Sequence, residues 1–184
     1  MPLTTYTSGE VLTAASLNAN FTFAAANPVS KIGQVLSTTL TTQFTRSSAT
    51  MGDITGLTVS ITPTANTSKI YVTASVSVGT DNAVGYVFAQ LARGGTAISG
   101  AVATGTGSKI ATTSQVAAAV VQAMGSMSME FLDSPASTSA LTYSVQISSG
   151  GGAGLVKINS SYTDTDSNSF ARAVSTITVF EVLA

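Results

Sequence analysis

The chain has 184 residues, of which 44% are hydrophobic and only 8% are charged; its formal net charge is −1, and it contains no cysteine and no histidine. So small a charge gives no field to attract a phosphate backbone or an acidic membrane, and nucleic acid is not an expected partner. The absence of histidine removes the usual general base and most zinc sites, and the absence of cysteine removes disulfides and thiol chemistry.

The N-terminal stretch predicts a short helix. Thr13 has the residue type of an N-cap, good helix formers follow it, and Leu17 and Phe21 are spaced i, i+4 on one face. We expect a helix over about 13–25 that ends before Pro28, because the residue preceding a proline avoids the helical region. A helix of this length is marginal in isolation, so we expect it to need a partner.

The same stretch lacks the basic and apolar regions of a secretory signal, and we expect the chain to be made and kept in the cytoplasm. The longest apolar run, at 116–125, is about half the length needed to cross a bilayer, so no membrane insertion is expected.

From about residue 31, apolar and polar residues alternate as is typical of strands with one buried face. Segments rich in Pro, Gly, Asn and Ser separate the alternating runs. We expect about eight strands, at about 34–46, 57–61, 70–78, 84–93, 116–132, 141–149, 155–161 and 172–183. The pattern predicts an all-β fold, a single antiparallel β-sandwich that is jelly-roll-like, over residues 31–184, preceded by a separate N-terminal segment at 1–30.

The last predicted strand is apolar on both faces. Ile177 and Val179 point one way along it, whereas Phe180 and Val182 point the other way. The outer face of a strand in a two-layer sandwich meets water, so a second apolar face predicts a neighbouring subunit or a covering segment. We expect these four residues to form a subunit-interface strand and the protein to be an oligomer.

No motif for catalysis or cofactor binding is complete, and we expect neither an enzyme nor a cofactor. Without histidine, catalysis would fall to eight carboxylates, most of them at turn positions. The stretch Asp164–Asn168 has the oxygen donors of half a calcium loop, but Ser169 and Ser175 stand where such a loop needs glycine and glutamate. A surface ion site and a solvated loop remain alternatives there. Tyr162 is the tyrosine we nominate for a ligand contact, with packing at a strand edge as its alternative.

Two parts of the chain resemble tailed-phage virion proteins. The first is SGEVLTAASLNANF at 8–21, which is similar to a short N-terminal segment of such proteins. The second comprises DITGLTVSITPTANTSKIYVTASV, LARGGTAI and MSMEFLDSPASTSALTYSVQI, which look like a β module of phage fibre and other appendage proteins, especially from cyanophages and marine phages. The matching N-terminal residues are Gly9, Val11, Leu12, Thr13, Ala14, Leu17, Asn18, Asn20 and Phe21.

The resemblance implies a homotrimer in the virion, held on another virion protein by its N-terminal segment while the β domain projects outward. The residues that it assigns to anchoring or oligomer contact are Gly9, Val11, Leu12, Leu17, Asn20 and Phe21. The resemblance covers no catalytic motif and leaves the host target open.

Three functions follow as alternatives. The first is a non-enzymatic virion structural protein, a short trimeric fibre or spike that attaches to a host surface glycan or protein through several weak contacts. The second is a capsid decoration or cement protein that clamps shell subunits, which copy number per particle would separate from the first. The third is a carboxylate glycan depolymerase, which would shorten host polysaccharide.

Overall fold

The computed structural model describes residues 5–11, 13–26, 31–81, 86–117, 121–150 and 154–183. The chain divides into two compact units, residues 1–31 and residues 32–184. Each unit is described by itself below.

The N-terminal unit contains one helix, α1 (Ala14–Ala26), within a residue of the prediction. Thr13 caps it, since the backbone N–H of Ser16 donates to Thr13 Oγ1 at 3.2 Å. A turn precedes the cap, closed by the N–H of Glu10 donating to the carbonyl of Thr7 at 3.1 Å. Gly9 lies in that turn at φ +93°, a conformation that residues with a side chain rarely adopt.

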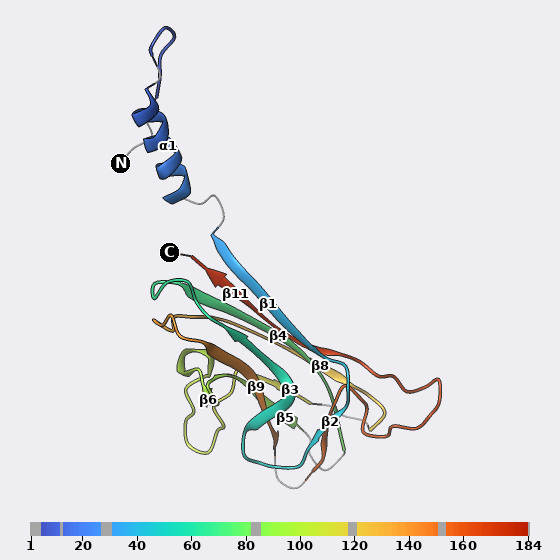
Figure 1. Ribbon diagram of the computed structural model, residues 1–184. Helices are drawn as coiled ribbons and strands as arrows, with labels where there is room; N and C mark the ends of the chain where they lie inside the picture. The colour runs from blue at the N-terminus through green and yellow to red at the C-terminus, as the bar shows by residue number, and fades with distance from the viewer. Residues whose placement is uncertain are drawn as a thin grey trace. The chain divides into compact units, whose positions relative to one another are not determined.

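The second unit consists of two β-sheets (Figure 1). The strands of the first sheet are β1 (Ile32–Leu40), β2 (Phe44–Arg46), β4 (Lys69–Thr80), β8 (Gly125–Asp133), β10 (Val156–Ile158) and β11 (Ser175–Val182). The strands of the second sheet are β3 (Gly52–Ile61), β5 (Tyr86–Arg93), β6 (Thr96–Ala97), β7 (Ser114–Val116) and β9 (Leu141–Gly150). A short 3₁₀ turn, η1 (Ser99–Ala101), follows β6. All the pairings are antiparallel.

The eleven strands of the described residues occupy eight positions across the two sheets, which we call lanes. Three lanes hold two strands each, one after the other: β1 with β2, β10 with β11, and β6 with β7. In the first sheet the order of lanes is β8, β4, then β10 and β11 together, then β1 and β2 together. In the second sheet the order is β3, β9, β5, then β6 and β7 together. An all-β, antiparallel chain was the prediction, and it is confirmed. Two predicted strands are wrong in extent: 34–46 is broken between β1 and β2, and 116–132 joins the end of β7 to β8 of the other sheet.

One apolar core lies between the two sheets, and it contains residues of both. Alternate residues of a strand point into this core, as the sequence predicts. Along β4 these are Ile70, Val72, Val76 and Val78, all completely buried. Tyr143 is the largest fully buried side chain, and it contributes from β9. The predicted burial of one face is therefore confirmed for β4, whereas β9 is buried on both faces over residues 143–150.

Asn159 organises both broken lanes of the first sheet. It is 1% exposed and adopts φ +66° where β10 ends. Its side-chain amide donates to the carbonyls of Leu40, at 2.7 Å, and Thr42, at 3.0 Å, and its Oδ1 accepts a hydrogen bond from Ser175 Oγ at 2.6 Å. These bonds occupy backbone groups of the break between β1 and β2, which is why 34–46 is not one continuous strand. The segment 159–174 between β10 and β11 is a loop whose two ends lie side by side, because the N–H of Ala173 donates to the carbonyl of Asn159 at 3.1 Å.

Glu181 is a carboxylate with no exposed surface, at an inward position of β11. Glu181 Oε1 accepts hydrogen bonds from the Thr64 N–H at 2.6 Å and the Thr64 hydroxyl at 2.7 Å, while Gln34 Nε2 donates to Oε2 at 2.7 Å. Burial alone would raise the pKa of Glu181, but the hydrogen bonds led by those of Thr64 hold it below the ordinary value. The carboxylate thus ties the turn after β3 and the edge strand β1 to β11.

We predict that the free energy of unfolding falls at acid pH through Glu181. Because the folded pKa is below that of the unfolded chain, this contribution is complete above about pH 4.5 and is lost as the pH falls through the folded pKa. Glu181→Gln should lower the free energy of unfolding by about 1–3 kcal/mol at neutral pH, since an amide nitrogen replaces one accepting oxygen. It should also make the fall of this free energy at acid pH, the acid limb of the curve, less steep. Urea unfolding at several pH values measures both effects. Asp166→Asn, at an exposed loop position, is the control; equal acid limbs for Glu181→Gln and the wild type would contradict the prediction.

Candidate functional site

The N-terminal unit presents apolar side chains to solvent. Val11 is 81% exposed, Leu17 38% and Phe21 65%. Leu17 and Phe21 are four residues apart on α1 and share one face of the helix. Apolar side chains grouped in this way are typical of a surface that another chain covers.

The other predicted anchoring residues have different positions. Gly9 forms the turn described above, and Asn20 is half-buried on α1. Leu12 lies outside the described residues. The contact role assigned to the six residues stays a prediction.

The outer face of the first sheet carries a row of apolar side chains that crosses four strands. Val35 of β1 pairs with Phe180 of β11, Phe180 pairs with Tyr71 of β4, and Tyr71 pairs with Leu132 of β8. The rings of Tyr71 and Phe180 are 6.0 Å apart between centroids. Val35 is 53% exposed and Leu132 44%. We call these four residues the apolar row.

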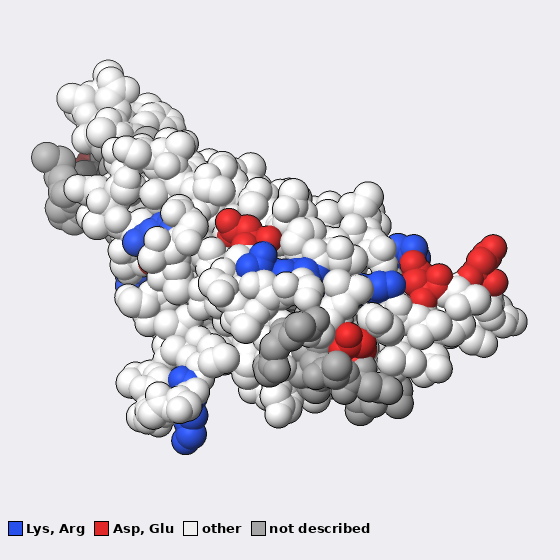
Figure 2. Space-filling view, turned by 90° about the horizontal axis from the view of Figure 1, so that it is seen from below, with Lys and Arg blue, Asp and Glu red and all other residues white. Residues whose placement is uncertain are grey.

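Beside the apolar row lies a second apolar pair, and beyond it the face becomes polar. Ile32 of β1 pairs with Val182 of β11 on one side. On the other side Ser37 pairs with Thr178, and their hydroxyls are hydrogen-bonded at 2.8 Å. Charged side chains are scattered over the face of the molecule that Figure 2 displays, and most of that surface is uncharged. The outer face of the first sheet thus has a mainly apolar end, where Lys69 pairs with Val182, and a hydroxyl-rich end. Glu130 lies at the hydroxyl-rich end and accepts a hydrogen bond from the Tyr71 hydroxyl.

The structure corrects two of the four residues predicted for the subunit interface. Ile177 and Val179 are 0% exposed within one chain and belong to the core between the sheets, so no other subunit can reach them. Phe180 and Val182 point to the outer face and are partly exposed. The two alternating sets of β11 were recognised in the sequence, but only pairing and burial decide which set faces inward.

Sequence reasoning missed Val35, Tyr71 and Leu132 as members of the same surface. Each lies on a different strand, far from Phe180 along the chain. Their common face follows from the strand register, which no local pattern contains. A known pairing of β1 and β4 with β11, and of β8 with β4, would have found them.

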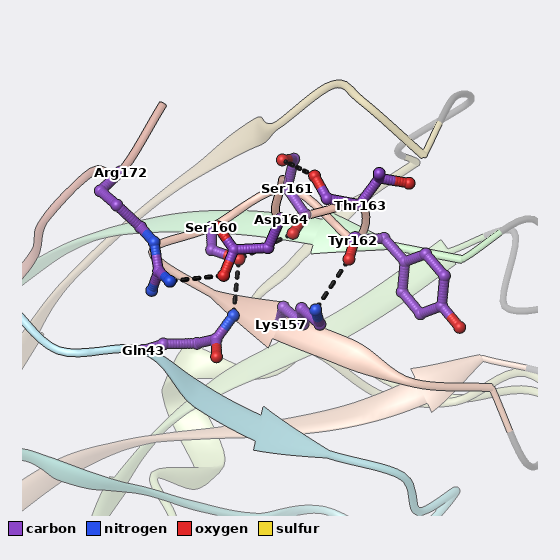
Figure 3. Close-up of polar contacts among 8 residues, drawn as sticks. All are labelled: Gln43, Lys157, Ser160, Ser161, Tyr162, Thr163, Asp164 and Arg172. Carbon is purple, nitrogen blue, oxygen red and sulfur yellow. Dashed lines mark hydrogen bonds and ion pairs between the residues drawn. The ribbon is translucent and has the colours of Figure 1, made fainter. Parts of the chain in front are cut away.

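The polar loop 159–172 is held by its own side chains and by neighbouring strands (Figure 3). Lys157 of β10 donates to the carbonyl of Tyr162 at 2.7 Å, and its Nζ lies 5.3 Å from the centroid of the Tyr162 ring. Gln43 donates to Ser160 Oγ at 2.7 Å, and the hydroxyl of Ser161 donates to the carbonyl of Thr163 at 2.7 Å. The ring of Tyr162 is therefore engaged in a cation–π contact within the chain, which favours a packing role over the ligand contact that we nominated.

The half calcium loop at Asp164–Asn168 has its first carboxylate already engaged. Asp164 forms an ion pair with Arg172, as Figure 3 shows. Among the described residues, no group of three or more Asp, Glu, His or Cys side chains is placed to hold a metal ion. The solvated-loop alternative thus fits the geometry of these residues better than an ion site does.

The eight carboxylates all lie among the described residues, and most are bound to neighbouring donors. Asp133, which is 5% exposed, accepts hydrogen bonds from Arg93 and from the hydroxyl of Tyr143. Burial, together with the charge of Asp133, raises the pKa of Tyr143 well above its ordinary value, so the phenol stays protonated. The other carboxylates that accept hydrogen bonds from neighbouring donors are Glu10, Asp53, Asp81, Glu130, Asp164 and Glu181. Their arrangement stabilises loops and sheet ends.

No protein-family model matches the chain, and a search of curated proteins returns no match. In the part of the chain that the structure describes, no helix combines the length and apolarity needed to span a membrane.

We predict that Val35→Asp disrupts self-association and leaves the β domain folded. A carboxylate in the apolar row cannot be covered without losing its hydration, whereas Val35 is exposed in one chain, so the fold itself tolerates the change. Thr39→Asp is the matched control, because Thr39 is exposed on the same face of β1 at its hydroxyl-rich end. Light scattering after size-exclusion chromatography measures the mass, and an equal effect of the two variants would count against the apolar row as an interface.

Proposed function

We propose that the protein is a non-enzymatic structural protein of a phage virion, a short trimeric fibre or spike. Its N-terminal segment docks on another virion protein, and its β domain attaches to the host surface. The observation that carries the proposal is that apolar surfaces lie in both units of one chain, the exposed face of α1 in the first and the apolar row in the second. Surfaces of this kind are typical of contacts between chains.

Each surface has its own task in the proposed particle. The apolar row packs against other copies, and α1 meets the particle or the helices of those copies. Full cover of an exposed apolar side chain contributes roughly 1.5–3 kcal/mol, so the apolar row supplies part of the free energy that holds the copies together. The number three comes from the resemblance to phage fibre proteins, whereas the residues themselves support only an oligomer.

The lane order supports a jelly-roll assignment for the β domain. Numbered along the chain, the lanes of the first sheet follow the order 1-8-3-6 and those of the second 2-7-4-5. Lanes 1 and 8, 2 and 7, 3 and 6, and 4 and 5 are neighbours, as in one long hairpin rolled into two layers. Jelly rolls recur in viral capsid proteins and lectins, and this fold-level analogy agrees with a role in a particle.

A binding role suits the chemistry of this chain better than a catalytic one. The carboxylates of Glu181, Asp133 and Asp164 are bound to donors within the chain, which fixes them as acceptors. Attachment by several weak copies needs no tight single site, because linking the copies raises the effective concentration of each.

We predict that deletion of residues 1–26 leaves a folded, soluble oligomer that no longer joins particles. The deletion removes α1 and its cap but no strand of either sheet. Circular dichroism and thermal unfolding measure the fold, and mass spectrometry of purified particles measures incorporation.

Point variants sharpen the same experiment. Phe21→Ser removes an exposed apolar side chain and should reduce incorporation, whereas Ala15→Ser, at an exposed position of the same helix, should not. Normal incorporation of the truncated chain would contradict anchoring through this segment, and an unfolded truncated chain would make the segment part of the core.

A further inference from the structure

A solvent-open hollow of about 430 Å³ lies on the outer face of the second sheet. Its lining combines two aromatic rings with polar and charged side chains: Tyr86, Phe88, Ser108, Lys109, Ile110 and Gln115. The hollow is separate from the apolar row, which lies on the first sheet. Small-molecule sites have this range of volume and this mixture of apolar lining and few polar groups.

The aromatic floor of the hollow is fixed by the strand beside it. The rings of Tyr86 and Phe88 lie 6.1 Å apart between centroids, both on β5. Gly150 of β9 pairs with Tyr86, and a Cβ at Gly150 would stand 2.6 Å from Tyr86 Cδ2 and 2.8 Å from Phe88 Cε2. The missing side chain therefore lets both rings lie against β9. Tyr86 is nevertheless 47% exposed, so part of its ring is open to a ligand.

The rim of the hollow carries hydrogen-bond donors in defined places. Gln115 of β7 pairs with Phe88 across the strands, which places its amide beside the floor. Lys109 closes a turn by donating its N–H to the carbonyl of Thr106 at 3.2 Å, and Gly107 occupies this turn at φ +62°. The loop that bears Lys109 is joined to β5 where the N–H of Thr113 donates to the carbonyl of Ala89 at 2.9 Å.

The charge at the hollow is positive. The ion pairs of the described residues are formed by Arg93 and Arg172, which leaves the ammonium group of Lys109 uncompensated by a carboxylate there. Stacking rings beside a lysine also suit a nucleic-acid base, but the net charge of −1 and the scattered cations argue against a phosphate backbone.

We propose that this hollow binds one acidic sugar residue of a surface glycan. A pyranose ring has an apolar C–H face and a rim of hydroxyls, which match the aromatic floor and the donors of Gln115 and Ser108. A sugar carboxylate matches Lys109, which is the charged residue among the described residues of the lining. The inference rests on the proposed attachment role and names the chemistry of the target.

The test is a binding titration of the full chain with two acidic oligosaccharides, one of galacturonate and one of N-acetylneuraminate, and with their neutral methyl esters. We expect binding to at least one acidic oligosaccharide and weaker binding to its ester. Tyr86→Ala and Lys109→Gln should each weaken binding by about tenfold or more. Lys109 is exposed on a loop, so its replacement should leave the packing of the core unchanged.

Two control variants match these changes elsewhere. Lys69→Gln removes an exposed cation from the first sheet, and Tyr162→Ala removes the aromatic ring on the polar loop; neither should alter binding. Binding that survives both Tyr86→Ala and Lys109→Gln overturns the site and leaves attachment through another surface. If the acid and its ester bind equally well and Lys109→Gln changes neither affinity, the proposal that the ligand is acidic is overturned. Failure to bind either acidic oligosaccharide overturns the inference, whereas the proposed virion role is tested separately by incorporation into particles.

Discussion

The register of the first sheet places four apolar side chains in a row on the side that faces away from the core. Strand pairing leaves no choice here: once Val72 and Val179 are buried between the sheets, their neighbours Tyr71 and Phe180 must point outward. Val35 and Leu132 extend the row at both sides. The core between the sheets buries only one face of this sheet, and we propose that a second chain covers the other. The proposed assembly depends on this constraint.

The remaining surface of the strands is polar but carries few charges. Only 8% of the residues are charged, and hydroxyl groups on neighbouring strands pair with one another instead, as in Ser37–Thr178 and Ser60–Thr142. Hydroxyls on paired strands satisfy one another and carry no charge. A net charge near zero provides little repulsion between copies, which is compatible with association through the apolar row.

Much of this fold could be predicted from local pattern, because alternation and capping are local. The cap at Thr13, the helix to Ala26 and the inward positions of β4 needed only neighbours in the sequence. Breaks in strands depend on distant partners instead. The side-chain amide of Asn159 donates hydrogen bonds to carbonyls more than a hundred residues away in the sequence. The end of β1 is therefore set by a residue that the local alternation pattern does not contain.

The candidate sites follow the same division. Helical spacing predicts that Leu17 and Phe21 share one face of α1, whereas the assignment of Ile177 and Val179 to an interface was wrong because both strand faces are apolar. Among the tyrosines, Tyr162 stood out by its polar neighbours, but its ring is engaged by Lys157, and Tyr86 is the more exposed one beside a hollow. The hollow at Tyr86 depends on the pairing of β5 with β9 and on Gly150, and only the folded chain brings these together.

Sedimentation equilibrium of the full chain at micromolar concentration tests the central claim most directly. If the outer apolar row and the exposed face of α1 are contacts between copies, the protein sediments with three times the mass of one chain. A stable monomer at that concentration would mean that a single chain tolerates both surfaces in water, and it would contradict the account.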